Sequence, residues 1–303
     1  CVQNHELMLR AVQYAGMFGL PVMDHCQDDS LVTDGVMHEG LYSTILGLRG
    51  WPAEGEELIV ARNILLAERT GVHIHCQHVS TAGSVRLLRE AQARGVPISG
   101  EACPHHFTLT DAAVAGSETF WSTDGKALYP DADPRRLPHW DAFDTHFKMN
   151  PPLRSADDRK AVIQAVMDGV LSVIASDHAP HTNYEKEVEF DHAPFGIIGM
   201  ETELGLALTQ LHHRGGMPLR DLVARFTSGP ARLLGLDEKG TLRPGADGDI
   251  TLIDPDLEWT PTPAATASKA RNCPFYGWPL KGRAVATIIG GKVAWKLEED
   301  VLP

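Results

Sequence analysis

The chain of 303 residues is 43% hydrophobic and 22% charged, a composition typical of a globular protein with one main domain and room for a smaller one. Its formal net charge of −13 argues against nucleic acid as a partner, because such binding depends on clustered lysines and arginines that neutralise phosphates. No apolar run approaches the roughly 20 residues that cross a bilayer. These properties favour a small-molecule substrate and predict no membrane association.

Five cysteines, an odd number without CxxC spacing, predict neither a disulfide framework nor a structural zinc knuckle. Free thiols are typical of a reducing compartment, so we expect a cytoplasmic protein. The sequence begins at Cys1 without an initiator methionine or a targeting pattern, and we expect that an N-terminal segment is missing from it.

Helices and strands alternate along most of the chain. Helical periodicity and end signals predict helices at residues 6–16, 56–69, 81–94, 156–167, 200–213 and 219–226, and apolar runs predict strands at residues 20–23, 72–77, 96–103 and 170–175. Strands that alternate with helices imply a parallel sheet, either open or closed into a barrel.

Two regions interrupt this alternation. Residues 112–146 are too long for a plain connection, so they are either functional or an insertion, and we favour a surface insertion. From residue 240 onward the helices stop, and short β-type runs at 249–253, 283–289 and 292–295 predict a small β domain. We therefore expect a first domain at 1–239 and a second at 240–303.

Three side chains suited to metal binding each follow an apolar strand. They are His25 in MDHCQDD, His78 in HCQHVST and Asp177 in IASDHAPH. Any one of them alone is more often an ordinary polar residue, but in a parallel barrel the active site lies at these carboxyl strand ends. Two imidazoles and a carboxylate that converge there could hold a catalytic zinc ion with an open position.

The neighbouring histidines need a separate interpretation. Side chains alternate along a strand, so Ile74, Cys76 and His78 should share one face while His73 and His75 point the other way. If His78 binds metal, we expect His73 and His75 to pack against helices.

At these residues the sequence resembles a known family, the dihydroorotases of the amidohydrolase superfamily. The bacterial class carries MDHCED, QHVST, PHH, MNPPLR and DHAPH, and the matching segments here are residues 23–28, 77–81, 104–106, 149–154 and 177–181. Residues 194–202 (PFGIIGMET) and 268–282 (SKARNCPFYGWPLKG) match as well. The resemblance covers nearly the whole chain in family order.

The resemblance implies an α/β fold, a (β/α)8 TIM-type barrel of which roughly the second half is present, followed by the small β domain. The family's first-strand HxH motif and its fourth-strand residue that bridges two metals have no counterpart in this sequence. The resemblance also implies one or two zinc ions and a homo-oligomer that can associate with aspartate carbamoyltransferase.

The resemblance assigns a role to each matching residue. His25 and His78 correspond to metal ligands, and Asp177 to an aspartate that touches the metal and acts as the general base. Asn150 and His181 correspond to substrate-binding residues, and backbone groups of Phe195 and Gly196 line the same pocket.

The implied activity is the interconversion of dihydroorotate and N-carbamoyl-L-aspartate in pyrimidine biosynthesis. A hydantoinase or allantoinase is the alternative among enzymes, and DHAPH and MNPPLR favour dihydroorotase because they supply a His and an Asn suited to an anionic substrate. A non-catalytic scaffold for a partner enzyme is the alternative from another class, although such a protein would normally have lost its ligands.

Overall fold

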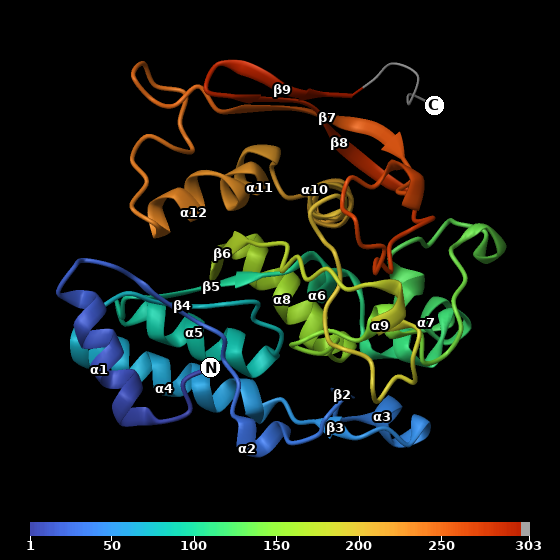
Figure 1. Cartoon of the computed structure of the whole chain (residues 1–303), viewed down its shortest axis with the longest axis horizontal. Helices are drawn as coiled ribbons and strands as arrows, with labels where there is room; N and C mark the ends of the chain where they lie inside the picture. The colour runs from blue at the N-terminus through green and yellow to red at the C-terminus, as the bar shows by residue number, and fades with distance from the viewer. Residues whose placement is uncertain (298–303) are drawn as a thin grey trace.

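The computed structural model describes residues 1–297 (Figure 1). Its α-helices are α1 His5–Gly16, α2 Asp29–Val32, α3 Leu41–Leu46, α4 Glu54–Thr70, α5 Ala82–Ala93, α6 Pro104–Thr108, α7 Ser117–Ser122, α8 Ala156–Asp168, α9 Asn183–Lys186, α10 Glu203–Ala207, α11 Leu219–Phe226 and α12 Ser228–Leu233. Its strands are β1 Val22–Asp24, β2 Met37–His38, β3 Gly50–Trp51, β4 Ile74–Cys76, β5 Ile98–Ala102, β6 Leu171–Ile174, β7 Ile250–Trp259, β8 Leu280–Ile289 and β9 Lys292–Lys296.

A four-stranded parallel sheet forms the centre of the first part of the chain. Its strand order is β1-β4-β5-β6, which is also the order of these strands along the sequence. The predicted alternation of strands and helices is therefore confirmed, and the fold belongs to the α/β class, consistent with part of a TIM-type barrel.

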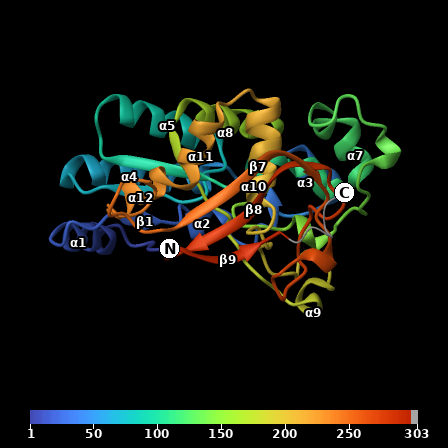
Figure 2. The same ribbon diagram turned by 90° about the horizontal axis from the view of Figure 1, so that it is seen from above.

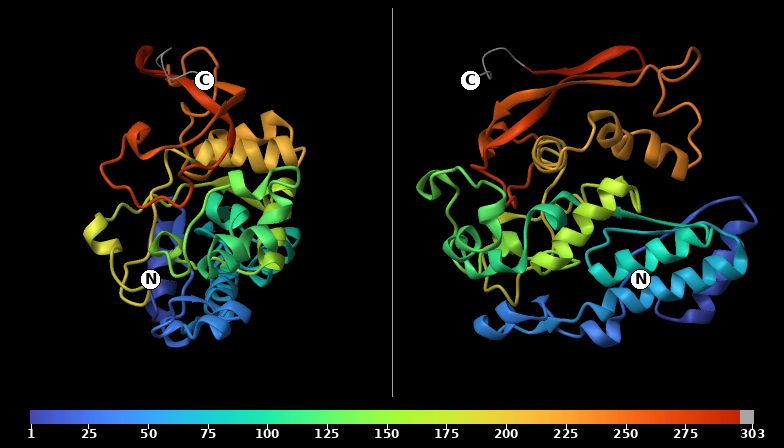
Figure 3. Two further views of the ribbon diagram at one scale, coloured as in Figure 1. Left: turned by 90° about the vertical axis from the view of Figure 1, so that its right-hand side faces the viewer. Right: turned by 180° about the vertical axis from the view of Figure 1, so that it is seen from behind.

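Capping residues mark the ends of the helices between these strands. At the start of α8 the Ser155 hydroxyl accepts a hydrogen bond from the Asp158 N–H, and Gly169 ends the helix in the left-handed conformation with φ +89°. Helices α4, α5 and α8 lie side by side along the sheet (Figures 1 and 3).

An aliphatic core lies between the parallel sheet and its helices. We use this name for a cluster of buried residues that includes Val12, Cys26, Ile59, Val60, Ile64, Ile74, Cys76, Val79, Val85, Leu88, Val162, Leu171, Ile174, Leu208 and Leu222. Its members recur at helical spacing in α4, α5 and α8, which explains why these helices were predictable from the sequence.

The expectation that His73 and His75 pack against helices is wrong. Ile74 and Cys76 belong to the aliphatic core, whereas the His75 ring contacts the Ser99 hydroxyl at 2.7 Å, and the His73 ring contacts the same hydroxyl at 2.7 Å. The alternation argument failed because β4 ends at Cys76, so the side chain of a residue two positions later need not stay on the face that the strand pattern assigns.

The stretch at residues 112–146 does not lie wholly on the surface, and whether it is an insertion stays a prediction. It forms 3-10 turns and helix α7 and carries an aromatic core, a name we give to the buried cluster that includes Leu109, Phe120, Trp121, Tyr129, Trp140, Phe147, Met149, Phe190, Ile197, Ile198, Cys273, Phe275, Trp278 and Leu280. The rings of Trp140 and Trp278 stack with their centroids 6.3 Å apart. Hydrophobic packing against distant segments therefore orders this stretch. Its sequence has no helical or strand periodicity from which this structure could be predicted.

The C-terminal strands form a separate antiparallel sheet in the order β7-β8-β9, which confirms the three predicted β runs (Figure 2). The segment between β7 and β8 returns to the first part of the chain, because Phe275 and Trp278 belong to the aromatic core. The division at residue 240 stays a prediction, and its last six residues, 298–303, lie outside the described part.

The predicted helix at 200–213 is built in two parts, since α10 continues into a π-helical stretch, η5 Leu208–Arg214. Within residues 1–297, no helix is long and apolar enough to cross a membrane.

Candidate active site

The backbone of the parallel sheet brings His25 and His78 together. Beyond the last paired residues of β1 and β4, the Gln77 N–H donates to the Asp24 carbonyl at 3.0 Å, so the two polar turns leave the sheet side by side. The His25 Nδ1 and His78 Nε2 atoms then lie 2.8 Å apart. Two of the three predicted ligands thus meet through ring nitrogens.

Two of the predicted ligands have strained backbones. His78 has φ +35° and Asp177 has φ +47°, and only two other non-glycine residues in the described chain have positive φ. This conformation costs about 1–3 kcal/mol for such residues and concentrates at functional sites, where it directs a side chain that a regular strand would place elsewhere.

Gln27 connects the histidine pair to Asn150. Its Oε1 atom lies 2.7 Å from His25 Nε2 and accepts a hydrogen bond from Asn150 Nδ2 at 3.0 Å, while its own amide donates to Asp29 at 3.0 Å. Because an amide oxygen only accepts, His25 carries its proton on Nε2 and turns the Nδ1 lone pair toward His78.

His78 is held neutral by its surroundings. Burial lowers its pKa to about 4, and the nearby His25 lowers it further. Its Nδ1 atom is buried and has no hydrogen-bond partner in residues 1–297. With the Nδ1 lone pair of His25 turned toward it, His78 Nε2 carries the shared proton, and a cation between the two rings would require that proton to move to the unpaired Nδ1.

Asp177 lies near this pair but does not contact it. Desolvation raises the pKa of its carboxyl, the His25 imidazole opposes that rise, and Glu101 adds to it, even though Asp177 as a whole remains exposed. The donor atoms of His25, His78 and Asp177 do not all lie within 4.8 Å of one another. Its role as a ligand therefore stays a prediction.

Glu101 is a site residue that the sequence interpretation missed. It is buried at the carboxyl end of β5, binds His75 Nε2 at 3.1 Å, and its charge acts on both His78 and Asp177. It lies within β5 rather than after it, so the strand-end signal that marked His25 did not apply, although a charged residue inside an apolar strand could have identified it.

Three of the four residues predicted to bind substrate, His181, Phe195 and Gly196, form a second group. His181 Nε2 donates to the Phe195 carbonyl at 2.9 Å, which ties the loop after β6 to the loop that contains Gly196. The Asn272 amide donates to the Ala179 carbonyl at 2.9 Å and to the Gly196 carbonyl at 3.1 Å. Asn272 lies in the segment 268–282, which resembles the family but which the domain division places in the second domain, so the sequence interpretation assigned it no role in the site.

Cys103, His105 and His106 form a buried cluster, and His78 lies near enough to affect the pKa of both histidines. Their donor atoms lie within 4.8 Å of one another, the only such group of three in residues 1–297. Burial lowers the pKa of His106 to about 3 and also lowers that of His105, while it raises the pKa of the Cys103 thiol. The cluster is thus an uncharged set of donors, and a cation here would have to displace the thiol proton.

Other residues of the resembling segments have structural contacts. Asp24 accepts hydrogen bonds from Arg62 and Asn63 of α4, both at 2.7 Å. Arg154 donates to the Ser80 hydroxyl at 3.1 Å and to the Trp51 carbonyl at 2.9 Å. These buried contacts fix the turns that carry the site.

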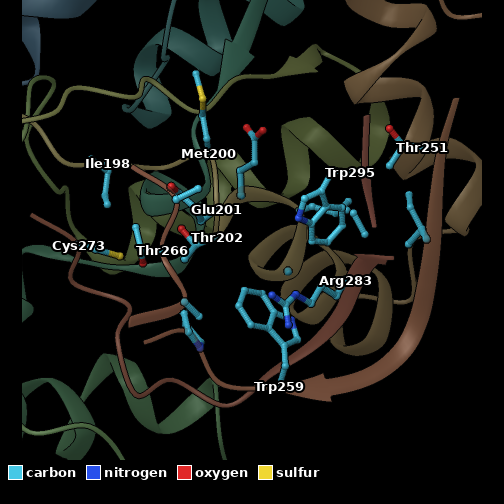
Figure 4. A pocket seen from close by; sticks show the side chains of 18 of the residues that line it. Ile198, Met200, Glu201, Thr202, Thr251, Trp259, Thr266, Cys273, Arg283 and Trp295 are labelled. Carbon is cyan, nitrogen blue, oxygen red and sulfur yellow. The ribbon is translucent and has the colours of Figure 1, made fainter. Parts of the chain in front are cut away.

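A separate pocket of about 490 Å³ lies between α10 and the C-terminal sheet (Figure 4). Trp259, Trp295, Arg283 and Glu201 line it, and none of the seven predicted site residues does. The Arg283 guanidinium lies over the Trp259 ring, 4.6 Å from its centroid.

The fold and site together define an α/β protein with imidazole and carboxylate groups at the carboxyl ends of parallel strands. The amidohydrolase family matches residues 3–294, so the chain belongs to the amidohydrolase family. It is 53% identical to a dihydroorotase from Pelotomaculum thermopropionicum over 292 residues. This matched region is 96% of this chain and 62% of that protein. It is 46% identical to a dihydroorotase from Syntrophotalea carbinolica over 298 residues, a region that makes up 98% of this chain and 64% of that protein. The chain thus spans somewhat less than two thirds of the length of these relatives.

Solved structures agree on the fold. A D-hydantoinase (dihydropyrimidinase) from Thermus sp. matches 97% of this chain and 60% of its own with a TM-score of 0.78 at 23% identity. The L-hydantoinase (dihydropyrimidinase) from Arthrobacter aurescens matches 99% of this chain and 62% of its own with a TM-score of 0.78 at 24% identity.

Proposed function

We propose that the protein is a metal-dependent dihydroorotase, which interconverts dihydroorotate and N-carbamoyl-L-aspartate in pyrimidine biosynthesis. The observation that carries this proposal is the continuous contact from His78 through His25 and Gln27 to Asn150. It joins a pair of metal-type donors to a residue suited to a polar substrate. The identity to two dihydroorotases supports the same choice.

The residues fit a zinc ion. His25 Nδ1 offers a lone pair, the neutral His78 ring faces it, and the Asp177 carboxylate lies near them, which is a nitrogen and oxygen donor set that zinc accepts. A bound zinc ion, one or two per chain, would supply Lewis-acid polarisation of the ring carbonyl and activation of water.

The protein's own groups then position the substrate and move the proton. Water adds to the ring carbonyl carbon, the carbon–nitrogen bond of the cyclic amide breaks, and the leaving nitrogen takes up a proton. Asp177 accepts the proton of the water on a carboxylate oxygen and delivers it to that nitrogen, and its raised pKa suits this transfer.

Asn150 and His181 orient the ring in this proposal. Asn150 Oδ1 is buried and has no partner in residues 1–297, so it can accept a hydrogen bond from a ring N–H. His181, which donates to the Phe195 carbonyl beside Gly196, binds the substrate carboxylate in this proposal.

The test is to incubate the purified protein with dihydroorotate, hydantoin and allantoin in parallel, and to measure bound zinc in the same sample. We expect turnover of dihydroorotate above that of the other two, and loss of both zinc and turnover in His78→Ala. Preferred turnover of hydantoin would indicate a hydantoinase. A zinc-loaded protein that hydrolyses none of the three would support the scaffold alternative and overturn the proposal.

The proposed function also implies a cellular location and an oligomeric state. We propose a cytoplasmic homo-oligomer that acts on a small-molecule substrate and can associate with aspartate carbamoyltransferase. Exposed apolar side chains of α1, among them Leu7 and Tyr14, support an interface between subunits. Light scattering of the protein alone and with aspartate carbamoyltransferase would test both associations.

A further inference from the structure

Two buried lysines lie beside the substrate-binding residues and have no part in the chemistry described above. Lys186, at the end of α9, is 3% exposed, and Lys148, two residues before Asn150, is 2% exposed. Lysines are almost never fully buried unless they are paired with an acid. These two therefore need an explanation.

The Lys186 ammonium binds three backbone carbonyls. It donates to Pro194 at 2.8 Å, to Thr145 at 3.0 Å and to Lys148 at 3.4 Å. An ammonium has three N–H donors, so this arrangement uses all of them. The Thr145 hydroxyl in turn donates to the Lys186 carbonyl at 2.6 Å, which ties the same two segments together a second time.

Lys148 joins the same two segments from the opposite direction. Its ammonium donates to the Phe190 carbonyl at 2.7 Å and to the Asp191 carbonyl at 3.0 Å. It also lies 4.7 Å from the centroid of the Phe195 ring, within cation–π distance. The Lys148 carbonyl accepts a hydrogen bond from the Gly196 N–H at 2.9 Å.

No carboxylate of residues 1–297 lies within 4.0 Å of either ammonium. The direct partners of both charges are backbone carbonyls, joined at Lys148 by aromatic rings, while Asp191 and Asp144 act on Lys148 and Lys186 from farther away. Burial lowers the pKa of each ammonium to about 8. Asp191 opposes this fall at Lys148, whereas at Lys186 the neighbouring Lys148 adds to it and Asp144 opposes it. Removing an ammonium from water costs free energy, so a buried lysine contributes little to overall stability. Its hydrogen bonds nevertheless hold the surrounding carbonyls in one arrangement.

We propose that Lys148 and Lys186 are positioning residues that hold the loop at residues 187–196 against the segment that carries Asn150. The two ammonium groups set where Phe195 and Gly196 lie relative to Asn150, and so shape the part of the site that recognises the substrate. Neither lysine touches the substrate. This inference rests on the proposed function for its kinetic readout, but not for its structural one.

The test uses Lys186→Met and Lys148→Met, which keep a stem of similar length and remove the donors. Lys186→Arg retains the charge in a larger, planar group. Lys160→Met, at an exposed position of α8, is the matched control. Hydrogen exchange of residues 187–196 is measured beside that of β4 and β5, together with bound zinc and steady-state kinetics on dihydroorotate.

We expect faster exchange at residues 187–196 in both methionine variants and unchanged exchange in β4 and β5. We also expect unchanged zinc, and a KM raised at least about tenfold with a smaller fall in kcat, since small displacements of positioning groups have large kinetic effects. Lys186→Arg should recover part of the loss, and Lys160→Met should match the parent protein.

Unchanged exchange at 187–196 in both methionine variants would overturn the proposal. Uniformly faster exchange across the sheet would also overturn it, because the lysines would then be general stabilisers. If the parent protein does not hydrolyse dihydroorotate, the proposed function fails, but the exchange comparison still decides the role of the lysines.

Discussion

The two buried cores of the molecule support different halves of the site. The aliphatic core contains Cys26, Val79 and Ile174, which are neighbours of the predicted metal ligands or close to them along the chain. The aromatic core contains Met149, Ile197 and Cys273, the neighbours of Asn150, Gly196 and Asn272. The proposed metal-binding half is thus supported by regular strands and helices, and the proposed substrate-binding half by irregular segments packed around aromatic rings.

Because of this difference, we expect the two halves of the site to tolerate changes in sequence differently. Parallel strands with short turns place side chains at fixed spacing, which suits a metal site that needs fixed ligands. Irregular segments fixed by side-chain contacts can change their shape without disturbing the sheet. The comparison predicts that the two halves can be damaged separately.

The largest effect should come from the metal-binding half. Asp177→Asn keeps the shape of the side chain but cannot accept a proton, so we expect kcat for dihydroorotate to fall by about 10²–10⁴ with the fold intact. Asp34→Asn is the matched control, because Asp34 also has a positive φ of +55° and is exposed. A kcat within about twofold of the parent in Asp177→Asn would show that another group is the base.

The cores themselves can be compared through two truncations. Trp278 is fully buried, with its ring centroid 5.0 Å from that of Trp121 and 5.4 Å from that of Phe275, so Trp278→Ala should destabilise the fold by about 3–5 kcal/mol. Leu88→Ala in the aliphatic core should cost about 2–5 kcal/mol. Urea unfolding measures both.

Ligand binding by these two variants sharpens the comparison. We expect Trp278→Ala to keep its zinc and lose substrate affinity, and Leu88→Ala to lose zinc first. Parallel loss of zinc and substrate in both variants would show that the two halves of the site do not respond independently.

A smaller effect is expected at Asn272, which links the β7–β8 segment to the substrate-binding loops. Asn272→Ala removes the donors to the Ala179 and Gly196 carbonyls, and we expect KM to rise about tenfold while zinc content stays constant. Asn183→Ala, at the exposed start of α9, is the control. An unaltered KM in Asn272→Ala would mean that the loops are held by other contacts.

The sequence was sufficient to predict the parallel sheet and the neighbourhood of His25 and His78, because periodic apolar residues and polar residues at strand ends are local signals. It could not predict the aromatic core, since Trp140 and Trp278 meet only after the chain has folded. The roles of Gln27 and Asn272 were missed for the same reason. The alternation of strand side chains holds at His75 but misled when it was extended to His78, because β4 ends at Cys76.

The smallest effect concerns Asp111, a buried carboxyl beside the aromatic core. Burial raises its pKa from the ordinary 3.8 to about 7, and the nearby Asp124 adds to the rise. Between about pH 4 and pH 7 the folded protein therefore binds more protons at this carboxyl than the unfolded chain, so its contribution to stability is full below pH 4 and is lost as the pH rises through 7.

Asp111→Asn should remove this loss because an amide stays neutral at every pH in this range. One pKa unit corresponds to about 1.4 kcal/mol, and local relaxation on ionisation reduces the full difference, so we expect the variant to be about 2 kcal/mol more stable than the parent at pH 8. The gap should narrow steadily as the pH falls from 7 to 5, and it should close only near pH 4. Asp131→Asn, at an exposed position of the same stretch, should show no such trend. Urea unfolding from pH 5 to pH 8 measures the difference, and a constant gap between Asp111→Asn and the parent would show that Asp111 ionises equally in the folded and unfolded protein.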